Sequence, residues 1–129
     1  MPSGSQTLLI GLALWELFRY DILLRVRGFR RIHQSLSRTQ PEPSRQDRNL
    51  ETRIAEAVNW AVCLYWKPTL CLQRSVATAR LFRKHGVAAT VVIGCRPEPF
   101  FSHAWVEIAG KVVNDSPVYQ QRLSVLERI

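Results

Sequence analysis

A chain of 129 residues, 47% of them hydrophobic and 22% charged, has the size and composition of one globular domain. These values exclude wholesale disorder and a collagen-like fibre, and the lack of an internal repeat excludes a solenoid. The 18 Lys and Arg residues outnumber the 10 Asp and Glu residues, and the resulting net charge of +8 suggests a polyanionic partner: nucleic acid, a membrane surface or an acidic peptide.

Residues 1–34 are predicted to form an amphipathic helical segment. Apolar residues recur there at spacings of three and four and make one helical stripe: Leu8, Leu12, Trp15, Phe18, Ile22, Val26 and Phe29. We expect this stripe to pack on the chain's own domain. The alternative is a docking face for a partner or a membrane surface, which the following arginines favour. The apolar run from Leu8 to Trp15 is too short to span a bilayer, which takes about 20 residues.

Two further helices are predicted after a break. Residues 35–49 contain two prolines and are predicted to be a loop or tether. A second helix begins near Leu50 and ends before Pro68, because proline lacks an N–H and disfavours helix in the residue before it. A third helix is predicted from Cys71 to His85, with Gly86 as its C-terminal stop.

The remaining segments predict strands. Residues 87–93 are β-branched and nearly uncharged, and residues 101–108 and 111–115 are two further strands joined at Ala109-Gly110. Helices followed by strands, without strict alternation, indicate an α+β fold in which helices pack on a small antiparallel sheet. We place this domain at residues 50–129.

The cysteines point to a reducing compartment, and one of them to reactivity. Cys63, Cys71 and Cys95 cannot all pair within one chain, and their spacing offers no CxxC metal knuckle, so we expect a cytoplasmic protein. Cys71 lies at a predicted helix N-terminus, where free N–H groups and the helix dipole favour the thiolate. Arg74, one turn later, can add to the positive potential there. Taken alone, Cys71 is also consistent with a buried structural thiol.

A histidine and an aspartate supply the other parts of a catalytic group. A three-residue hairpin loop at residues 108–110 would bring three pairs of residues opposite one another: Glu107 and Lys111, Trp105 and Val113, His103 and Asp115. Opposed residues have Cβ atoms about 4.5–5.5 Å apart, so Asp115 could orient the imidazole of His103. A register slip of one residue would separate them. Together with Cys71, the pair would form a Cys-His-Asp triad for acyl transfer, in which the histidine is the base next to the nucleophile and the aspartate orients the histidine.

Three segments resemble the signature of a transglutaminase-like peptidase, specifically the stand-alone leader peptidase of lasso-peptide biosynthesis. They are Cys71-Leu72-Gln73-Arg74-Ser75, Phe101-Ser102-His103-Ala104-Trp105-Val106-Glu107 and Val112-Val113-Asn114-Asp115. The resemblance covers about residues 50–129 and implies a transglutaminase/papain-like cysteine protease core. It implies that Cys71 attacks the scissile carbonyl of a ribosomally made precursor peptide, that His103 shuttles the proton and that Asp115 orients His103.

The resemblance also implies partners. Members of this type receive the precursor from a separate leader-recognition protein, and an ATP-dependent cyclase then closes the ring on the freed core peptide. The sequence has no Gly-rich phosphate loop and no metal-ligand cluster, so we expect no cofactor and no metal. Two alternatives stay open: a transglutaminase-like acyltransferase, and a non-enzymatic basic module that binds nucleic acid or membranes.

The distribution of charge favours a protein partner over nucleic acid. Residues 1–50 carry eight cations and four anions, and residues 51–129 carry ten and six, so both parts have a net charge of +4. The shorter part concentrates its excess in a cluster of four arginines: Arg25, Arg27, Arg30 and Arg31. We expect this arginine cluster to bind an acidic face of the leader or of the delivery protein, and we expect no nucleic-acid binding.

Overall fold

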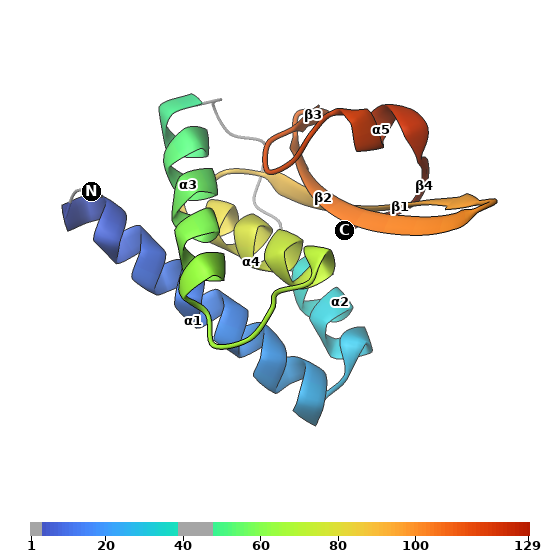
Figure 1. Cartoon of the computed structure of the whole chain (residues 1–129). Helices are drawn as coiled ribbons and strands as arrows, with labels where there is room; N and C mark the ends of the chain where they lie inside the picture. The colour runs from blue at the N-terminus through green and yellow to red at the C-terminus, as the bar shows by residue number, and fades with distance from the viewer. Residues whose placement is uncertain (1–3, 39–47) are drawn as a thin grey trace.

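The computed structural model of the chain describes residues 4–38 and 48–129. Its elements, in chain order, are α1 (Gly4–Val26), α2 (Phe29–Arg38), α3 (Arg48–Leu64), α4 (Cys71–Lys84), β1 (Ala89–Pro97), β2 (Phe100–Ile108), β3 (Lys111–Val112), α5 (Val118–Arg122) and β4 (Ser124–Arg128). The four strands form one antiparallel sheet in the order β3-β2-β1-β4. Helices α1–α4 lie on one side of the sheet, and α5 lies on the other (Figure 1). The predicted α+β fold is confirmed.

Helix α1 packs through the face opposite to the predicted one. Its buried apolar residues are Leu9, Ile10, Ala13, Leu17 and Tyr20. The predicted stripe is instead largely exposed, with 67% of Leu8, 51% of Trp15 and 70% of Val26 accessible. The prediction that this stripe packs on the domain is therefore wrong. Because the helix is apolar on nearly all sides, spacings of three and four can be traced along either face.

The N-terminal helical segment is divided where the sequence predicted continuity. Gly28 has a φ of 77°, and its N–H donates to the Leu23 carbonyl at 3.0 Å, so a left-handed residue ends α1. Helix α2 then runs to Arg38, into the predicted loop at residues 35–49, and α3 begins at Arg48. Residues 39–47 of that predicted loop lie outside the described residues. No helix within residues 4–38 or 48–129 is long and apolar enough to cross a bilayer.

The C-terminal part contains more regular structure than predicted. Strand β1 extends to Pro97, beyond the predicted end at residue 93, and β4 adds a fourth strand on its far edge. Helix α5 connects β3 to β4 and covers the outer face of the sheet. Between the helical layer and the sheet lies one apolar core, formed by residues of α1–α4, β1 and β2.

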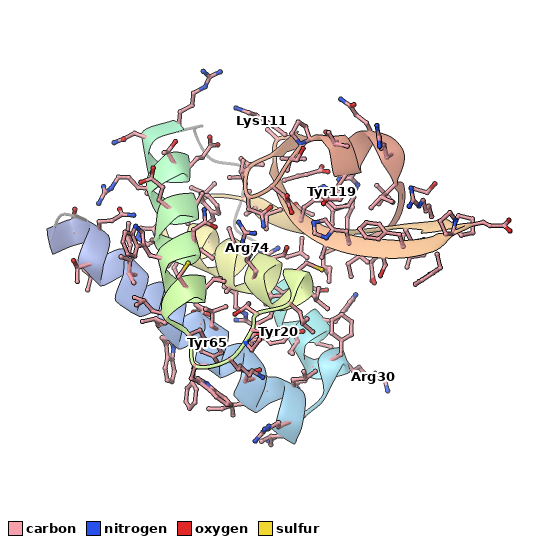
Figure 2. All side chains as sticks on the ribbon, viewed as in Figure 1. Tyr20, Arg30, Tyr65, Arg74, Lys111 and Tyr119 are labelled. Carbon is pink, nitrogen blue, oxygen red and sulfur yellow. The ribbon has the colours of Figure 1, made fainter. Side chains whose placement is uncertain are left out.

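A polar cluster fixes the start of α4 against α1. The carboxylate of Asp21 accepts hydrogen bonds from the Tyr65 hydroxyl and, at 3.0 Å, from Gln73 Nε2, and it pairs with Lys67 Nζ at 2.7 Å. Gln73 Nε2 also donates to the Leu17 carbonyl at 3.0 Å. Tyr65 and Lys67 belong to the connection between α3 and α4, which passes α1 beside the labelled Tyr65 (Figure 2). The cluster therefore determines where the first turn of α4 lies.

The ionised form of Asp21 is the form that the cluster stabilises. Burial alone would raise the pKa of Asp21, but the hydrogen bonds from Lys67, Tyr65 and Gln73 outweigh it and lower the pKa below its ordinary value. Burial and the hydrogen bond to Asp21 raise the pKa of Tyr65 to about 12. Both shifts keep the carboxylate charged and the phenol protonated at neutral pH.

We expect Asp21→Asn to lower the free energy of unfolding at pH 7 by about 2 kcal/mol. The amide lacks the negative charge that strengthens these hydrogen bonds and pairs with Lys67 in a buried site. A carboxylate whose pKa is lowered on folding stabilises the protein above its unfolded pKa of about 3.9, and this contribution disappears as the pH falls through the folded value. The difference between wild type and variant should therefore shrink at pH 3. Urea unfolding followed by circular dichroism measures it, with exposed Glu56→Gln as the control. Equal stability of Asp21→Asn and wild type at pH 7 would contradict the role of the cluster.

Candidate active site

Cys71 is the first residue of α4 and is half-buried. The preceding Leu70 is extended, with φ −77° and ψ 159°, and no described side chain caps the helix. The partial positive charge of the first-turn N–H groups therefore remains available to an anion at this end. Cys63 is exposed in α3 and Cys95 is half-buried in β1, so neither of them lies at a helix N-terminus.

Tyr20 of α1 lies beside this end of the helix. Burial raises the pKa of the Tyr20 phenol, and the negative charges of Asp21 and of the Cys71 thiolate add to the effect. The Tyr20 phenol therefore stays protonated at neutral pH.

The first turn of α4 is tied to the segment that follows β3. Arg74 Nη2 donates to the Asn114 carbonyl at 3.1 Å and to Asn59 Oδ1 at 2.6 Å, and Asn114 Nδ2 donates to the Ser75 hydroxyl at 3.5 Å. Residues 71, 74 and 75 share one face of an α-helix. The face that carries Cys71 therefore meets Asn114. The structure thus gives Arg74 a bridging role between α4 and this segment, whereas its predicted effect on the potential at Cys71 stays a prediction.

The hairpin between β2 and β3 has a two-residue loop, and the predicted three-residue loop is wrong. Ala109 and Gly110 have φ values of 52° and 80°, which a type I′ loop requires at both positions. Ile108 pairs with Lys111 and Glu107 pairs with Val112, so each predicted pairing is displaced by one residue on the β3 side. The type I′ loop matches the twist of the two strands, which outweighs the strain of a left-handed alanine.

His103 and Asp115 meet in spite of this displacement, with Nε2 and Oδ2 2.6 Å apart. The reason is that the ladder between the strands stops early. Val113 N–H donates to the Val106 carbonyl at 3.0 Å, but Val106 N–H donates at 2.8 Å to the side-chain Oδ1 of Asn114. The backbone leaves the strand at Asn114, and the Asp115 carboxylate reaches the imidazole from outside the strand register.

The His103 imidazole lies in a stack of aromatic rings. Phe101 and Trp105 are on the same side of β2 as His103, with ring centroids 6.2 Å and 6.4 Å from the imidazole. The ring of Tyr119 from α5 packs closer, at 4.1 Å. The His103 side chain is only 16% exposed. Because Asp115 occupies Nε2, Nδ1 is the nitrogen that can exchange a proton with a thiol.

Tyr119 is the site residue that sequence reasoning missed. It lies in a helix of five residues, too short to show an apolar period. A tyrosine close to Asp115 in the sequence is the only signal that could have pointed to it.

A second buried carboxylate fixes this stack from below. Trp105 is fully buried, and its Nε1 donates to Glu107 at 2.8 Å. Burial would raise the pKa of Glu107, but hydrogen bonds from Trp105, Arg128 and Gln120 lower it. A Cβ at Gly94 would lie 2.6 Å from the Trp105 ring, so only glycine lets the indole lie over β1. These contacts fix the position of the Trp105 ring, against which the imidazole of His103 packs.

The predicted arginine cluster lies elsewhere. Arg25 and Arg27 are at the end of α1, Arg30 and Arg31 are at the start of α2, and all four are exposed. Figure 2 shows Arg30 well apart from Tyr119. The structure therefore brings His103 and Asp115 together and ties the Cys71 helix to their segment, but it does not bring the arginine cluster to the same place.

Comparison with known proteins identifies the family. The model of the transglutaminase-like superfamily matches residues 14–128, nearly the whole chain, including Cys71, His103 and Asp115. The microcin J25-processing protein McjB of Escherichia coli is 44% identical over 59 residues, which are 46% of this chain and 28% of McjB. No solved structure matches the chain. The resemblance seen in the sequence is confirmed: the chain belongs to the transglutaminase-like superfamily.

Proposed function

We propose that the chain is a cysteine peptidase that removes the leader from a ribosomally made lasso-peptide precursor. The observation that carries the proposal is the 2.6 Å contact between His103 Nε2 and Asp115 Oδ2, on a segment bonded to the first turn of the Cys71 helix. Membership of the transglutaminase-like superfamily supports cysteine-dependent acyl chemistry. Similarity to a protein that processes microcin J25 supports a peptide substrate.

In the proposed mechanism, His103 Nδ1 takes the proton of the Cys71 thiol as Sγ attacks the scissile carbonyl. The Cys71 backbone N–H, at the N-terminus of α4, donates a hydrogen bond to the oxyanion that forms. His103 then gives its proton to the leaving amine, and an acyl-enzyme remains. Attack by water, with its proton passing to Nδ1, releases the leader carboxylate and restores the thiol. Asp115 keeps the Nε2–H bonded and stabilises the imidazolium throughout.

We expect Cys71→Ala to abolish cleavage of a candidate precursor peptide, because the nucleophile is lost. Cys63→Ala and Cys95→Ala are matched controls that should cleave at the wild-type rate. Mass spectrometry measures the products, and hydrolysis adds one water to the sum of their masses, whereas transfer to an amine does not. Undiminished cleavage by Cys71→Ala would defeat the proposal, and an amine adduct of the leader would favour the acyltransferase alternative.

Asp115→Asn should lower kcat by about a hundredfold to ten-thousandfold and leave KM little changed, because the amide no longer stabilises the imidazolium and can favour the wrong tautomer. Steady-state cleavage kinetics of the same peptide provide the measurement. Asn59→Asp, which alters an exposed neighbour on the other side of Arg74, is the control for a general disturbance of charge. A kcat within twofold of wild type for Asp115→Asn would remove Asp115 from the mechanism.

We also propose that a separate leader-recognition protein delivers the precursor in the cytoplasm, before an ATP-dependent cyclase acts on the freed core. The arginine cluster at the α1–α2 connection is exposed, and Figure 2 shows Arg30 apart from Tyr119, which packs on His103. This placement suits a docking surface for an acidic partner. Replacing all four arginines by alanine should reduce delivery-dependent cleavage at low salt by about tenfold and leave unassisted cleavage unchanged.

The matched control for this variant is Arg48→Ala with Lys111→Ala, which removes exposed cations from other parts of the surface. Cleavage rates with and without the delivery protein separate docking from catalysis. If the four-arginine variant responded to the delivery protein as wild type does, the cluster would have no part in delivery.

A further inference from the structure

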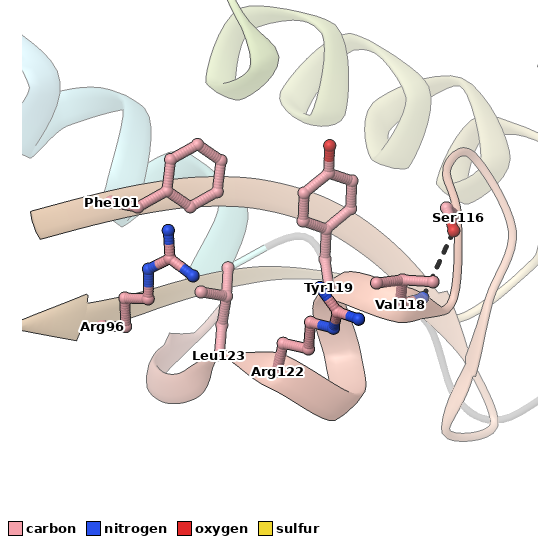
Figure 3. Close-up of a pocket in the computed structure, with 7 residues that line it drawn as sticks. All are labelled: Arg96, Phe101, Ser116, Val118, Tyr119, Arg122 and Leu123. Carbon is pink, nitrogen blue, oxygen red and sulfur yellow. Dashed lines mark hydrogen bonds between the residues drawn. The ribbon is translucent and has the colours of Figure 1, made fainter. Parts of the chain in front are cut away.

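A cavity of about 380 Å³ opens where α5 packs on the sheet (Figure 3). It is lined by residues of β1, β2, α5 and their connections: Arg96, Phe101, Ser116, Val118, Tyr119, Arg122 and Leu123. The volume suits one large side chain of a bound peptide.

The cavity is apolar in its walls and cationic at its sides. Phe101, Tyr119 and Leu123 supply the apolar surface, while the guanidinium groups of Arg96 and Arg122 extend alongside them (Figure 3). The Arg96 guanidinium lies over the Phe101 ring, 5.6 Å from its centroid, and its Nε donates to the Pro99 carbonyl at 3.2 Å. The aromatic ring thus orients one of the two cations toward the cavity.

In the part of the chain that the structure describes, neither Arg96 nor Arg122 forms an ion pair with a carboxylate. Arg128, the other arginine of the strands, pairs instead with Glu107 at 2.6 Å. Two unpaired guanidinium groups on one apolar cavity attract a carboxylate and repel a lysine or arginine side chain.

The cavity adjoins the candidate catalytic histidine. Tyr119 forms part of its wall and also packs on the imidazole, with 4.1 Å between the ring centroids. Phe101 lies against both Tyr119, at 6.1 Å, and His103. A peptide whose scissile bond lies at the imidazole therefore has a residue close to that bond beside the cavity.

We propose that this cavity is a specificity pocket for an acidic side chain of the substrate peptide close to the scissile bond. The aliphatic part of a glutamate packs against Tyr119 and Leu123, and its carboxylate is bound by Arg96 and Arg122. The inference rests on the proposed peptidase function, because it assigns the pocket to the substrate of that site.

Binding of a small probe tests the pocket without requiring turnover. 3-Phenylpropionate combines an apolar body with a carboxylate, and 3-phenylpropionamide is its neutral counterpart. We expect the carboxylate to perturb NMR signals of Tyr119 and Leu123 in both wild type and Cys71→Ala, with a dissociation constant on the order of millimolar. The amide should bind about tenfold more weakly. Arg96→Gln combined with Arg122→Gln should remove this preference, whereas Arg30→Gln on distant α2 should preserve it.

Cleavage kinetics test the assignment to substrate. In a precursor peptide that the enzyme cleaves, each of the three residues on either side of the scissile bond is replaced in turn by Glu, Gln and Lys. One position should favour Glu over Gln by about tenfold or more in kcat/KM, mainly through KM, and the double arginine variant should abolish that preference.

Equal binding of the carboxylate and the amide, or an unchanged preference in the double arginine variant, would contradict the proposal that Arg96 and Arg122 bind a carboxylate in this cavity. Probe binding without any position that favours Glu would overturn its assignment to the substrate. Failure of the peptidase proposal is recognised separately, by cleavage that survives Cys71→Ala.

Discussion

The geometry of the site depends on the hydrogen bonds and the ion pair that the buried carboxylate of Asp21 forms. This carboxylate gathers Tyr65, Lys67 and Gln73 and thereby sets the position at which α4 begins against α1. In the sheet, the Glu107 carboxylate likewise accepts hydrogen bonds from Trp105 and Arg128 and holds Trp105 beside His103. Each carboxylate is ionised because its hydrogen bonds outweigh the effect of burial on its pKa. One carboxylate fixes the helix that begins at Cys71, and the other fixes the sheet that carries the imidazole.

Local signals predicted the elements that carry the reactive groups, but not how they meet. Pro68 and Gly86 bracket α4 and place Cys71 at its start, and the β-branched runs predict the central strands, because these signals act within a few residues. The hairpin register depends on whether Ala109 accepts a left-handed conformation, which is decided by strand twist and packing. The His103–Asp115 contact depends on Asn114 replacing a backbone group in the ladder. Such tertiary choices leave no periodic pattern in the sequence. The buried face of α1 was missed for a different reason, because both faces of that helix carry apolar residues at spacings of three and four.

Several arginines of the described residues bond within the protein, and others are exposed at its surface. Arg83 donates to three backbone carbonyls, and burial followed by the charge of Arg80 lowers its pKa to about 10, so it stabilises the fold and offers little to a partner. Arg74 and Arg128 are likewise bonded within the protein. Among the exposed arginines of the described residues, four lie at the α1–α2 connection, two lie beside the aromatic stack, and Arg48 lies at the start of α3. In the part of the chain that the structure describes, the arginine excess is therefore divided among separate sites.

The central claim is that Cys71 is activated by His103, and the other two cysteines of the chain provide internal controls. Cys63 is more exposed than Cys71, so accessibility alone would make Cys63 react first. The most direct measurement is the rate of iodoacetamide alkylation of each cysteine, followed by peptide mass spectrometry, in wild type and in His103→Ala. We expect Cys71 to react fastest in the wild-type protein and to lose this advantage in His103→Ala, while the rates of Cys63 and Cys95 stay the same. Faster alkylation of Cys63 than of Cys71 in the wild-type protein, or a Cys71 rate that does not depend on His103, would contradict the claim.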